Sequence, residues 1–568
     1  MKKKFTPSAR LRRSVLSLAL ALAMLLSSCG IDVSSLVPDT GVKPAETSVS
    51  SDPSSEFPLA VISSARPNQT FGVGYTPEDV LDPYETRSSL NQQLSHLLYD
   101  SLFVIDGAGN VVHGICASIS TEDQITYVLT LQSGLTFHNG DRLTVHDVLY
   151  SLNRARRSSL FKLQLAPISD VSVDASAGTV SIRLERPLGS LAALLNIPIV
   201  SSNASAEYSY SRYALLGSGR YYIDRDVLEE TEYTYLQYNP SWYGYGDAPP
   251  ALPRIDLFTV TDKDDLLRRY FNSDVDILSL PSSLNDPIRL HGDAEMRRVT
   301  GSNLFFLGFN TVIQSFSSAA SRRGVELLID REALAEAAGE GLYLPVRYPV
   351  RAESRVAGYL AARDVPAPEE DSSAMALLRE AGFSDAGPEI TFMDKEYTVK
   401  LLFCTDSDAC AAIAAFVRDA LTEAGFRVEE NGCGYDDYVR ELYRGNFTMY
   451  IGMTRPAENY DYSYLIDYAD LFASLYSDVT GNEAAPGSSG VSAETEKYLA
   501  SIRGLNCFNS LYYLDLSAAL ADMFDAECPF VPLCFDLDTI YLRGSFVSNV
   551  LATGRDIFFN IDSWTSPR

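Results

Sequence analysis

The sequence predicts a multidomain α/β protein, and three observations lead to this class. About 510 of the 568 residues follow a polar N-terminal stretch, and the apolar content of 46% supplies enough side chains for two or three hydrophobic cores. The N-terminal half mixes short strand-like and helix-like patterns. In the C-terminal half, strands and helices alternate regularly, which is typical of a parallel sheet with crossover helices.

The first residues indicate export from a bacterial cell. Six basic residues precede an apolar run from Val15 to Leu26, and this order is typical of a signal peptide. A membrane-spanning helix is the weaker interpretation, because it needs about 20 apolar residues. We therefore expect a cleaved signal peptide over residues 1–28.

The segment Leu26-Ser27-Ser28-Cys29-Gly30 follows the apolar run and resembles the bacterial lipobox. This resemblance implies that Cys29 is diacylated and becomes the new N-terminus. The protein is then anchored to the outer face of the cell membrane, or held in the periplasm if the organism has an outer membrane. The alternative is an ordinary signal peptide with an accidental cysteine.

Residues 29–57 are expected to form a flexible tether. They are rich in Ser, Pro, Thr and Asp and contain few large apolar side chains, so burial cannot offset the entropy of ordering them. Removing the signal peptide lowers the formal charge from −28 to about −34. A surface this acidic repels phosphate groups, so we expect no nucleic-acid partner.

The cysteines do not indicate a metal or redox site. Of the eight cysteines, seven remain beside the lipidated Cys29, so at least one lacks an intrachain partner. The chain contains no Cys-x-x-Cys, which argues against a zinc ribbon or a thioredoxin-like centre. Pairing among Cys404, Cys410 and Cys433 stays open beside the alternative of buried free thiols.

The N-terminal half shows helix and strand patterns in turn. Apolar residues at helical spacing predict a helix over Ser89–Leu102, and alternation predicts a strand over Ile125–Leu131. Thr144 followed by Asp147 is an Asp variant of the capping box and predicts the start of a further helix. From about Val171 to Phe258 strand-like stretches dominate, broken by Gly and Pro.

The C-terminal half contains a β-α-β-α-β pattern within about 55 residues. Its elements are expected at 398–404 (strand), 411–424 (helix, closed by Gly425), 426–430 (strand), 435–443 (helix) and 447–453 (strand). Ligands of open α/β sheets bind beyond the carboxyl ends of the strands. The loop 454–462 that follows the third strand is therefore a candidate ligand-binding rim.

This loop contains the mixture of side chains that a small-molecule site needs. Arg455, Glu458, Asn459 and Asp461 can fix a ligand by charge and hydrogen bonds, and Tyr460 supplies apolar contact area. The alternative is a solvated loop whose tyrosines pack on their own domain.

Read in order, several blocks are similar to one known family. They are Leu81-Asp82-Pro83-Tyr84; Leu98-Tyr99-Asp100-Ser101-Leu102; Tyr127 to Gly140; Leu143 to Leu152; Asn239-Pro240-Ser241-Trp242-Tyr243; Phe306-Leu307-Gly308-Phe309-Asn310; Ile329-Asp330-Arg331; and Leu377 to Phe383. On these blocks the chain resembles the extracellular solute-binding proteins of family 5, the peptide, oligopeptide and nickel receptors of ABC importers.

The resemblance implies a two-lobed clamshell of the periplasmic-binding-protein type with an additional third domain. Lobe one is expected to combine residues 58–91, 206–300 and 532–568. The additional domain is expected at 92–205 and lobe two at 301–531. The resemblance also implies a binding protein and not an enzyme, without a cofactor or resident metal, that acts as a monomer beside an ABC permease and ATPase.

Two departures from the family pattern affect the expected ligand. Gly217-Ser218-Gly219-Arg220-Tyr221 has Arg220 where the family often has proline. Peptide-binding members carry an Asp-Tyr pair that binds the α-amino group of the peptide, and the matching pair here is Asn459-Tyr460. Recognition of an amine then moves to Asp461 or Glu458, or the ligand is not a free peptide.

Other candidate residues have structural alternatives. Asn310 can face the cleft or serve as a hinge, and Tyr75 follows the expected first strand and can reach the ligand. Trp242 and Tyr243 can stack on a ligand, but more often pack a hairpin. His138 and His146 lie in a family block as parts of a turn and a helix start, and we interpret both as structural.

The expected function is capture of a small solute, with an oligopeptide as the leading candidate, for a membrane permease. Nickel or another small solute is the alternative within the same fold, and a sensing or adhesion lipoprotein is a further one. A secreted hydrolase is disfavoured, because the chain contains no Gly-x-Ser-x-Gly, His-Glu-x-x-His or Walker sequence.

Overall fold

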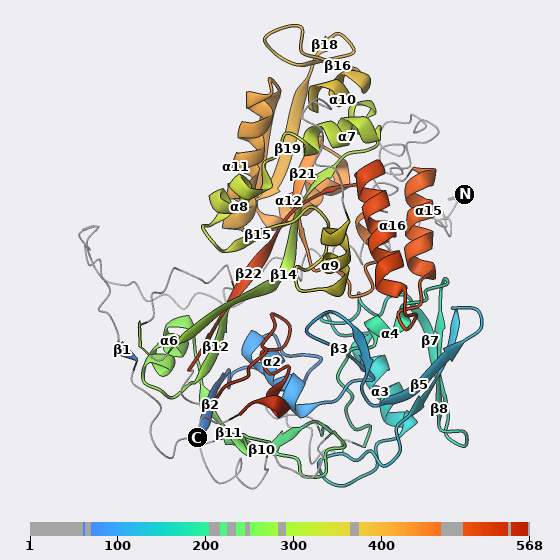
Figure 1. Ribbon diagram of the computed structural model, residues 1–568, viewed down its shortest axis with the longest axis vertical. Coiled ribbons are helices and arrows are strands. Elements are labelled where there is room, and N and C mark those ends of the chain that lie inside the picture. Colours follow the sequence, from blue (N-terminus) through green and yellow to red (C-terminus); the bar gives the residue numbers. More distant parts are fainter. Residues whose placement is uncertain are drawn as a thin grey trace, which may run out of the picture.

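The computed structural model shows two lobes joined by two long strands (Figure 1). It describes residues 61–62, 70–203, 216–223, 234–244, 250–281, 291–292, 294–363, 374–466, 492–543 and 547–565. The expected signal peptide, Cys29 and the tether lie outside the described residues. Among the helices within these ranges, none has the length and apolar character needed to cross a membrane.

One mixed sheet of 11 strands extends through both lobes. Its strand order is β20-β19-β21-β14-β22-β12-β2-β11-β10-β9, and β15 pairs with β22. The first-lobe part is formed by β2 (Phe71–Tyr75), β9 (Tyr221–Ile223), β10 (Thr234–Tyr238), β11 (Arg254–Thr259) and β12 (Ile277–Leu280). Helices α2 (Ser89–Leu98) and α6 (Lys263–Phe271) belong to the same lobe, and β1 (Val61–Ile62) pairs with β13 (His291–Gly292).

Helix α2 confirms the first expected helix and shows where it ends. Leu94, Leu97, Leu98 and Leu102 are all buried, as their spacing predicts. The helix ends at Leu98, because Tyr99 has an extended backbone with φ of −130° and ψ of 141°. The chain then runs directly to the strand that begins at Phe103.

The additional domain contains a four-stranded antiparallel sheet of order β5-β6-β8-β7. Asp147 accepts a hydrogen bond from the backbone N–H of Thr144 at 2.8 Å, so the predicted capping interaction starts helix α3. Its elements are β3 (Phe103–Ile105), β4 (Val111–His113), β5 (Cys116–Thr121), β6 (Thr126–Leu131), α3 (Val145–Ala155), β7 (Ile168–Asp174), β8 (Thr179–Leu184) and α4 (Leu191–Leu194).

The second lobe contains the predicted parallel strands. Strand β19 pairs in parallel with both β20 and β21, which confirms the β-α-β-α-β interpretation. Gly425 and Gly445 end the two crossover helices with φ of +98° and +62°, a backbone conformation that favours glycine. The elements are β19 (Thr398–Cys404), α11 (Asp408–Glu423), β20 (Arg427–Cys433), α12 (Tyr435–Arg444) and β21 (Met449–Thr454).

The remaining elements surround this core. They are η3 (Gln314–Phe316), α7 (Ala319–Glu326), α8 (Arg331–Ala338), β15 (Tyr343–Pro345), α9 (Arg355–Ala362), α10 (Ala374–Glu380), β16 (Phe383–Ser384), β17 (Thr391–Phe392), β18 (Lys395–Glu396), α13 (Ser463–Ile466), α15 (Ala493–Gly504), α16 (Tyr512–Ala526) and η4 (Ile561–Ser563). Helices α9, α15 and α16 lie on the side of the second lobe that faces the additional domain (Figure 1).

Two long antiparallel strands connect the lobes. Strand β14 (Glu295–Phe309) pairs with β22 (Val531–Leu542), and their register shifts between Thr300 and Leu304 and again between Phe305 and Phe306. Such irregularities bend a strand locally. The expected domain boundaries at 300/301 and 531/532 both fall within these two strands.

The seven described cysteines are free thiols. Six of them are buried and Cys433 is half-buried. In the described part of the chain, Cys404, Cys410 and Cys433 therefore form no disulfide, which agrees with the alternative of free thiols.

Candidate functional site

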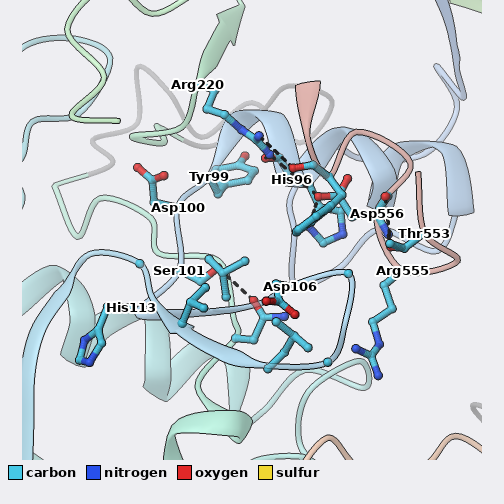
Figure 2. Close-up of a pocket in the computed structure, with 18 of the residues that line it drawn as sticks. His96, Tyr99, Asp100, Ser101, Asp106, His113, Arg220, Thr553, Arg555 and Asp556 are labelled. Carbon is cyan, nitrogen blue, oxygen red and sulfur yellow. Dashed lines mark hydrogen bonds and ion pairs between the residues drawn. The ribbon is translucent and has the colours of Figure 1, made fainter. Parts of the chain in front are cut away.

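A pocket of about 250 Å³ lies where the two lobes and the additional domain meet (Figure 2). Its wall comes from segments that are far apart in the chain. They are a set of residues between His96 and Gly114, Asn196, Arg220 with Trp242 and Tyr243, then Arg351, Glu353 and Ser354, and finally Thr553, Arg555, Asp556 and Phe559. Because helices and strands of different lobes supply this wall, its geometry depends on how the lobes are placed.

Asp100 is a buried carboxylate beside this pocket. Its Oδ1 accepts a hydrogen bond from Trp242 Nε1 at 3.0 Å, and its Oδ2 accepts one from Ser218 Oγ at 2.8 Å. Burial raises the pKa of Asp100 to about 6, and these two hydrogen bonds act against that rise. Trp242 thus packs in the wall and also fixes an acidic group there.

Arg220 occupies the position where the family often has proline, and it reaches the C-terminal segment. Its Nη1 lies 3.0 Å from Asp562 Oδ2, and its Nη2 lies 3.9 Å from Asp556 Oδ2. Figure 2 shows Arg220 directed toward His96 and Asp556. The departure from the family pattern therefore adds a cation that ties residues 556–562 to the pocket wall.

Two further guanidinium groups, those of Arg351 and Arg555, lie in the wall. The Arg351 side chain is only 7% exposed; its Nη1 donates to the carbonyl oxygens of Gly301 and, at 3.5 Å, Thr300. Arg555 forms a close ion pair with Glu458. Both side chains line this pocket, and burial followed by the positive charge of Arg351 lowers the pKa of Arg555.

Residues of the loop 454–462 contact the pocket wall without lining the pocket. Glu458 contacts the pocket wall through its ion pair with Arg555. Tyr460 is buried and has a φ of +56°, and a Cβ placed on the pocket residue Gly109 would lie 3.7 Å from its hydroxyl. Asn459 is buried, and its Oδ1 accepts a hydrogen bond from the N–H of Asp461 at 3.2 Å.

Asp461 is engaged by the additional domain. Its Oδ2 lies 3.6 Å from the Nη2 of Arg186, and the same Nη2 donates to Ser463 Oγ at 2.9 Å. Arg455 is exposed. The two carboxylates considered for amine recognition, Glu458 and Asp461, are thus both paired with arginines from outside the second lobe.

Asn310 and Tyr75 lie outside the wall of this pocket. The Nδ2 of Asn310 donates to the carbonyl oxygens of Gly445 at 3.2 Å and Phe447 at 3.0 Å, which joins the end of β14 to the segment before β21. Tyr75 ends strand β2, and its carbonyl oxygen accepts from the N–H of Val260 at 2.8 Å. The seven loop and strand candidates therefore remain predictions, and none of them lines this pocket.

His138 and His146, the two histidines of the block that resembles the family, lie outside the pocket wall. His138 Nε2 lies 3.2 Å from the carbonyl oxygen of Gly219, and burial lowers the pKa of His138 to about 4. His146 is exposed on α3. In the described ranges no three His, Cys, Asp or Glu side chains are placed to share a metal ion.

The residues that the sequence did not indicate are Arg351 and Arg555. Arg351 lies in an irregular segment before α9, and Arg555 lies in the C-terminal segment. Neither belongs to a repeated pattern or to one of the blocks that resemble the family, so only the folded arrangement brings them together. Arg220 carried a usable signal, because it replaces a proline.

Comparison with known proteins gives a family and several relatives. The sequence model described as "Bacterial extracellular solute-binding proteins, family 5 Middle" matches residues 110–472. The glutathione-binding protein GsiB of Salmonella typhimurium (strain LT2) is 23% identical over 386 residues, which cover 64% of this chain and 72% of that protein.

Solved structures share the fold at low sequence identity. The unliganded open form of MppA, a periplasmic murein tripeptide binding protein, has a TM-score of 0.66 at 17% identity and covers 89% of this chain and 98% of its own. A nickel ABC transporter protein from Bacillus halodurans has a TM-score of 0.66 at 16% identity, covering 86% and 98%.

Proposed function

Because the chain belongs to the bacterial extracellular solute-binding proteins of family 5, we propose that it captures a small solute between its lobes and delivers it to the permease of an ABC importer. The observation that carries this proposal is the position of the pocket. Its wall combines residues between His96 and Gly114 with Arg351, Glu353 and Ser354 and with residues between Thr553 and Phe559. A ligand held there touches both sides of the junction.

Contacts across the junction support closure around such a ligand. The backbone N–H of Arg355 donates to the carbonyl oxygen of Ala108 at 2.8 Å. The N–H of Val111 donates to the hydroxyl of Tyr513 at 3.1 Å. The N–H of Gly189 donates to the carbonyl oxygen of Arg503 at 2.7 Å. Each pair joins the additional domain to a helix or turn of the second lobe.

The mechanism requires no covalent chemistry. A ligand that contacts both walls binds the closed arrangement more tightly than an open one, and this difference in affinity shifts the population toward closure. The irregular register of β14 and β22 near Thr300 supplies a place where the two strands can bend. The permease then recognises the closed form of the receptor.

Pocket size favours a small ligand. About 250 Å³ is below the roughly 300–1,000 Å³ of pockets that enclose drug-sized molecules. The similar proteins named above bind glutathione and a murein tripeptide, and one belongs to a nickel transporter. A short peptide or peptide-like solute is therefore the leading ligand, with nickel as the alternative; longer extended peptides fit the pocket less well.

The expected anchor and domain division are parts of this proposal. Lipidated Cys29 and the tether 29–57 would keep the receptor at the outer face of the membrane and raise its concentration near the permease. Lobe one would comprise 58–91, 206–300 and 532–568, the additional domain 92–205, and lobe two 301–531. Replacing Cys29 by Ser should release the protein from the membrane fraction.

Two measurements test the transport proposal. The chain from residue 56 onward is purified, any bound solute is identified by mass spectrometry after denaturation, and small-angle scattering compares the protein with and without that solute. We expect a smaller radius of gyration with the solute. In cells, deletion of the chain should reduce uptake of the same solute; unchanged compactness together with unchanged uptake would contradict the proposal.

A further inference from the structure

Arg351 carries a buried positive charge that the described residues do not neutralise at close range. It is 7% exposed, and within the described ranges no carboxylate oxygen lies within 4.0 Å of its guanidinium nitrogens. The Nη1 of this side chain donates to backbone carbonyl oxygens, those of Gly301 and Thr300. A buried charge without a counterion costs free energy, so it usually persists where a ligand completes it.

Two acidic side chains, those of Asp536 and Asp538, interact electrostatically with Arg351 without forming an ion pair with it. Asp536 accepts hydrogen bonds from the N–H of Asn303 at 2.8 Å and from its Nδ2 at 2.6 Å. Burial, followed by the charge of Asp536, raises the pKa of Asp538 to about 7. Both carboxyl groups interact with Arg351 at longer range, but neither pairs with it directly.

Arg555 brings a second guanidinium to the same wall. One of its nitrogens pairs with Glu458, while its Nε is buried and has no hydrogen-bond partner among the residues that the structure places. Glu353 also lines the pocket and is exposed to solvent. In the view of Figure 2 the guanidinium of Arg555 points away from the group formed by Arg220 and Asp556.

We propose that Arg351 and Arg555 form the subsite for a carboxylate of the transported solute. Arginine suits this task, because its planar guanidinium can donate two parallel hydrogen bonds to a carboxylate. The inference rests on the proposed solute-binding function and narrows its ligand to a small molecule with at least one anionic group. The loop carboxylates Glu458 and Asp461 already form ion pairs with arginines of the protein. The protein therefore recognises the carboxylate of the ligand, and not an α-amino group, at this site.

The experiment compares carboxylates with the same molecules after their charge is removed. Binding is measured by calorimetry and by the shift in melting temperature with glutathione, trialanine and citrate. Glutathione diethyl ester and trialanine amide serve as the matched neutralised probes. We expect at least one carboxylate to bind, with its neutralised form weaker by at least about tenfold, as expected when a buried charged partner is left unpaired.

Three arginine variants assign the effect to the subsite. R351Q and R555Q should each weaken the binding carboxylate by about tenfold or more, and R351K should retain part of the affinity because the charge remains. R157Q is the matched control, since Arg157 is exposed and does not line the pocket. Two subsite variants are used because R351Q also removes the hydrogen bond to Gly301; circular dichroism without ligand checks that each variant is folded.

The outcomes separate this inference from the transport proposal. Binding of none of the carboxylates, equal binding of neutralised forms, or unchanged affinity in both R351Q and R555Q would overturn the subsite. If a neutral solute is found to compact the protein, the receptor function stands and the carboxylate subsite fails. If a carboxylate binds through both arginines without compaction or uptake, the subsite stands and the transport function fails.

Discussion

Replacing Asp538 by Asn should stabilise the protein at alkaline pH. Asp538 lies on β22 two residues from Asp536, so both side chains are on the same face of the strand. Burial is the main cause that raises the pKa of Asp538 to about 7, the charge of Asp536 adds to it, and Arg351 and Arg455 oppose it. Asparagine resembles the protonated acid and removes the cost of burying the charge.

Proton linkage gives the sign and the size of the change in the free energy of unfolding. The ordinary pKa is 3.8, and the folded value is about 7. Between these pH values the folded protein binds more protons than the unfolded chain, so the contribution of Asp538 to stability is present below pH 4 and is lost as the pH rises to about 7. A difference of about three pH units corresponds to roughly 4 kcal/mol at most. Because the two carboxyl groups titrate together, we expect about 2–4 kcal/mol in favour of D538N at pH 8.

Urea unfolding at pH 4.5 and pH 8 measures this effect. The free energies of unfolding of D538N and of the wild-type protein should differ by less than about 1 kcal/mol at pH 4.5 and should diverge at pH 8. D170N is the control, because Asp170 is an exposed residue of β7. Equal destabilisation of D538N at both pH values would refute the reasoning, since it would show that Asp538 is ionised in the folded protein and needed in that form.

Three other predictions address the pocket, the junction and the thiols. Because burial raises the pKa of Asp100 to about 6 and Asp100 accepts a hydrogen bond from Trp242, tryptophan fluorescence should change near pH 6; a change that persists in D100N would exclude this assignment. A Cβ on Gly189 would lie 2.5 Å from the carbonyl oxygen of Leu505, so G189A should loosen the junction, cost about 1–3 kcal/mol and raise the radius of gyration in small-angle scattering; an unchanged radius would argue against this contact. Cys433 is the one half-buried thiol among the seven described, so a thiol reagent should modify it first in the folded protein, and a fast phase that survives in C433S would contradict this order.

The placement of the site shows why the pocket was only partly predictable. The prediction that the loop 454–462 faces the ligand stays a prediction: its residues contact the wall residues Arg555, Gly109 and Ser354 but do not themselves line this pocket. A rule about the carboxyl ends of strands locates the region but not the first layer of side chains. That layer depends on segments of other domains, whose distance along the chain carries no local signal.

Local chemistry by itself determined the elements of the fold. The alternation in Thr398–Cys404, the cap formed by Thr144 and Asp147, and the left-handed glycines Gly425 and Gly445 act over a few residues, so their outcomes could be predicted. The ordered blocks likewise indicated the family. The convergence of Arg351 and Arg555 and the pairing of Asp461 with Arg186 were decided only by the tertiary structure. These contacts exist because the lobes and the additional domain meet, and no periodicity within one segment encodes which residues of another will face it.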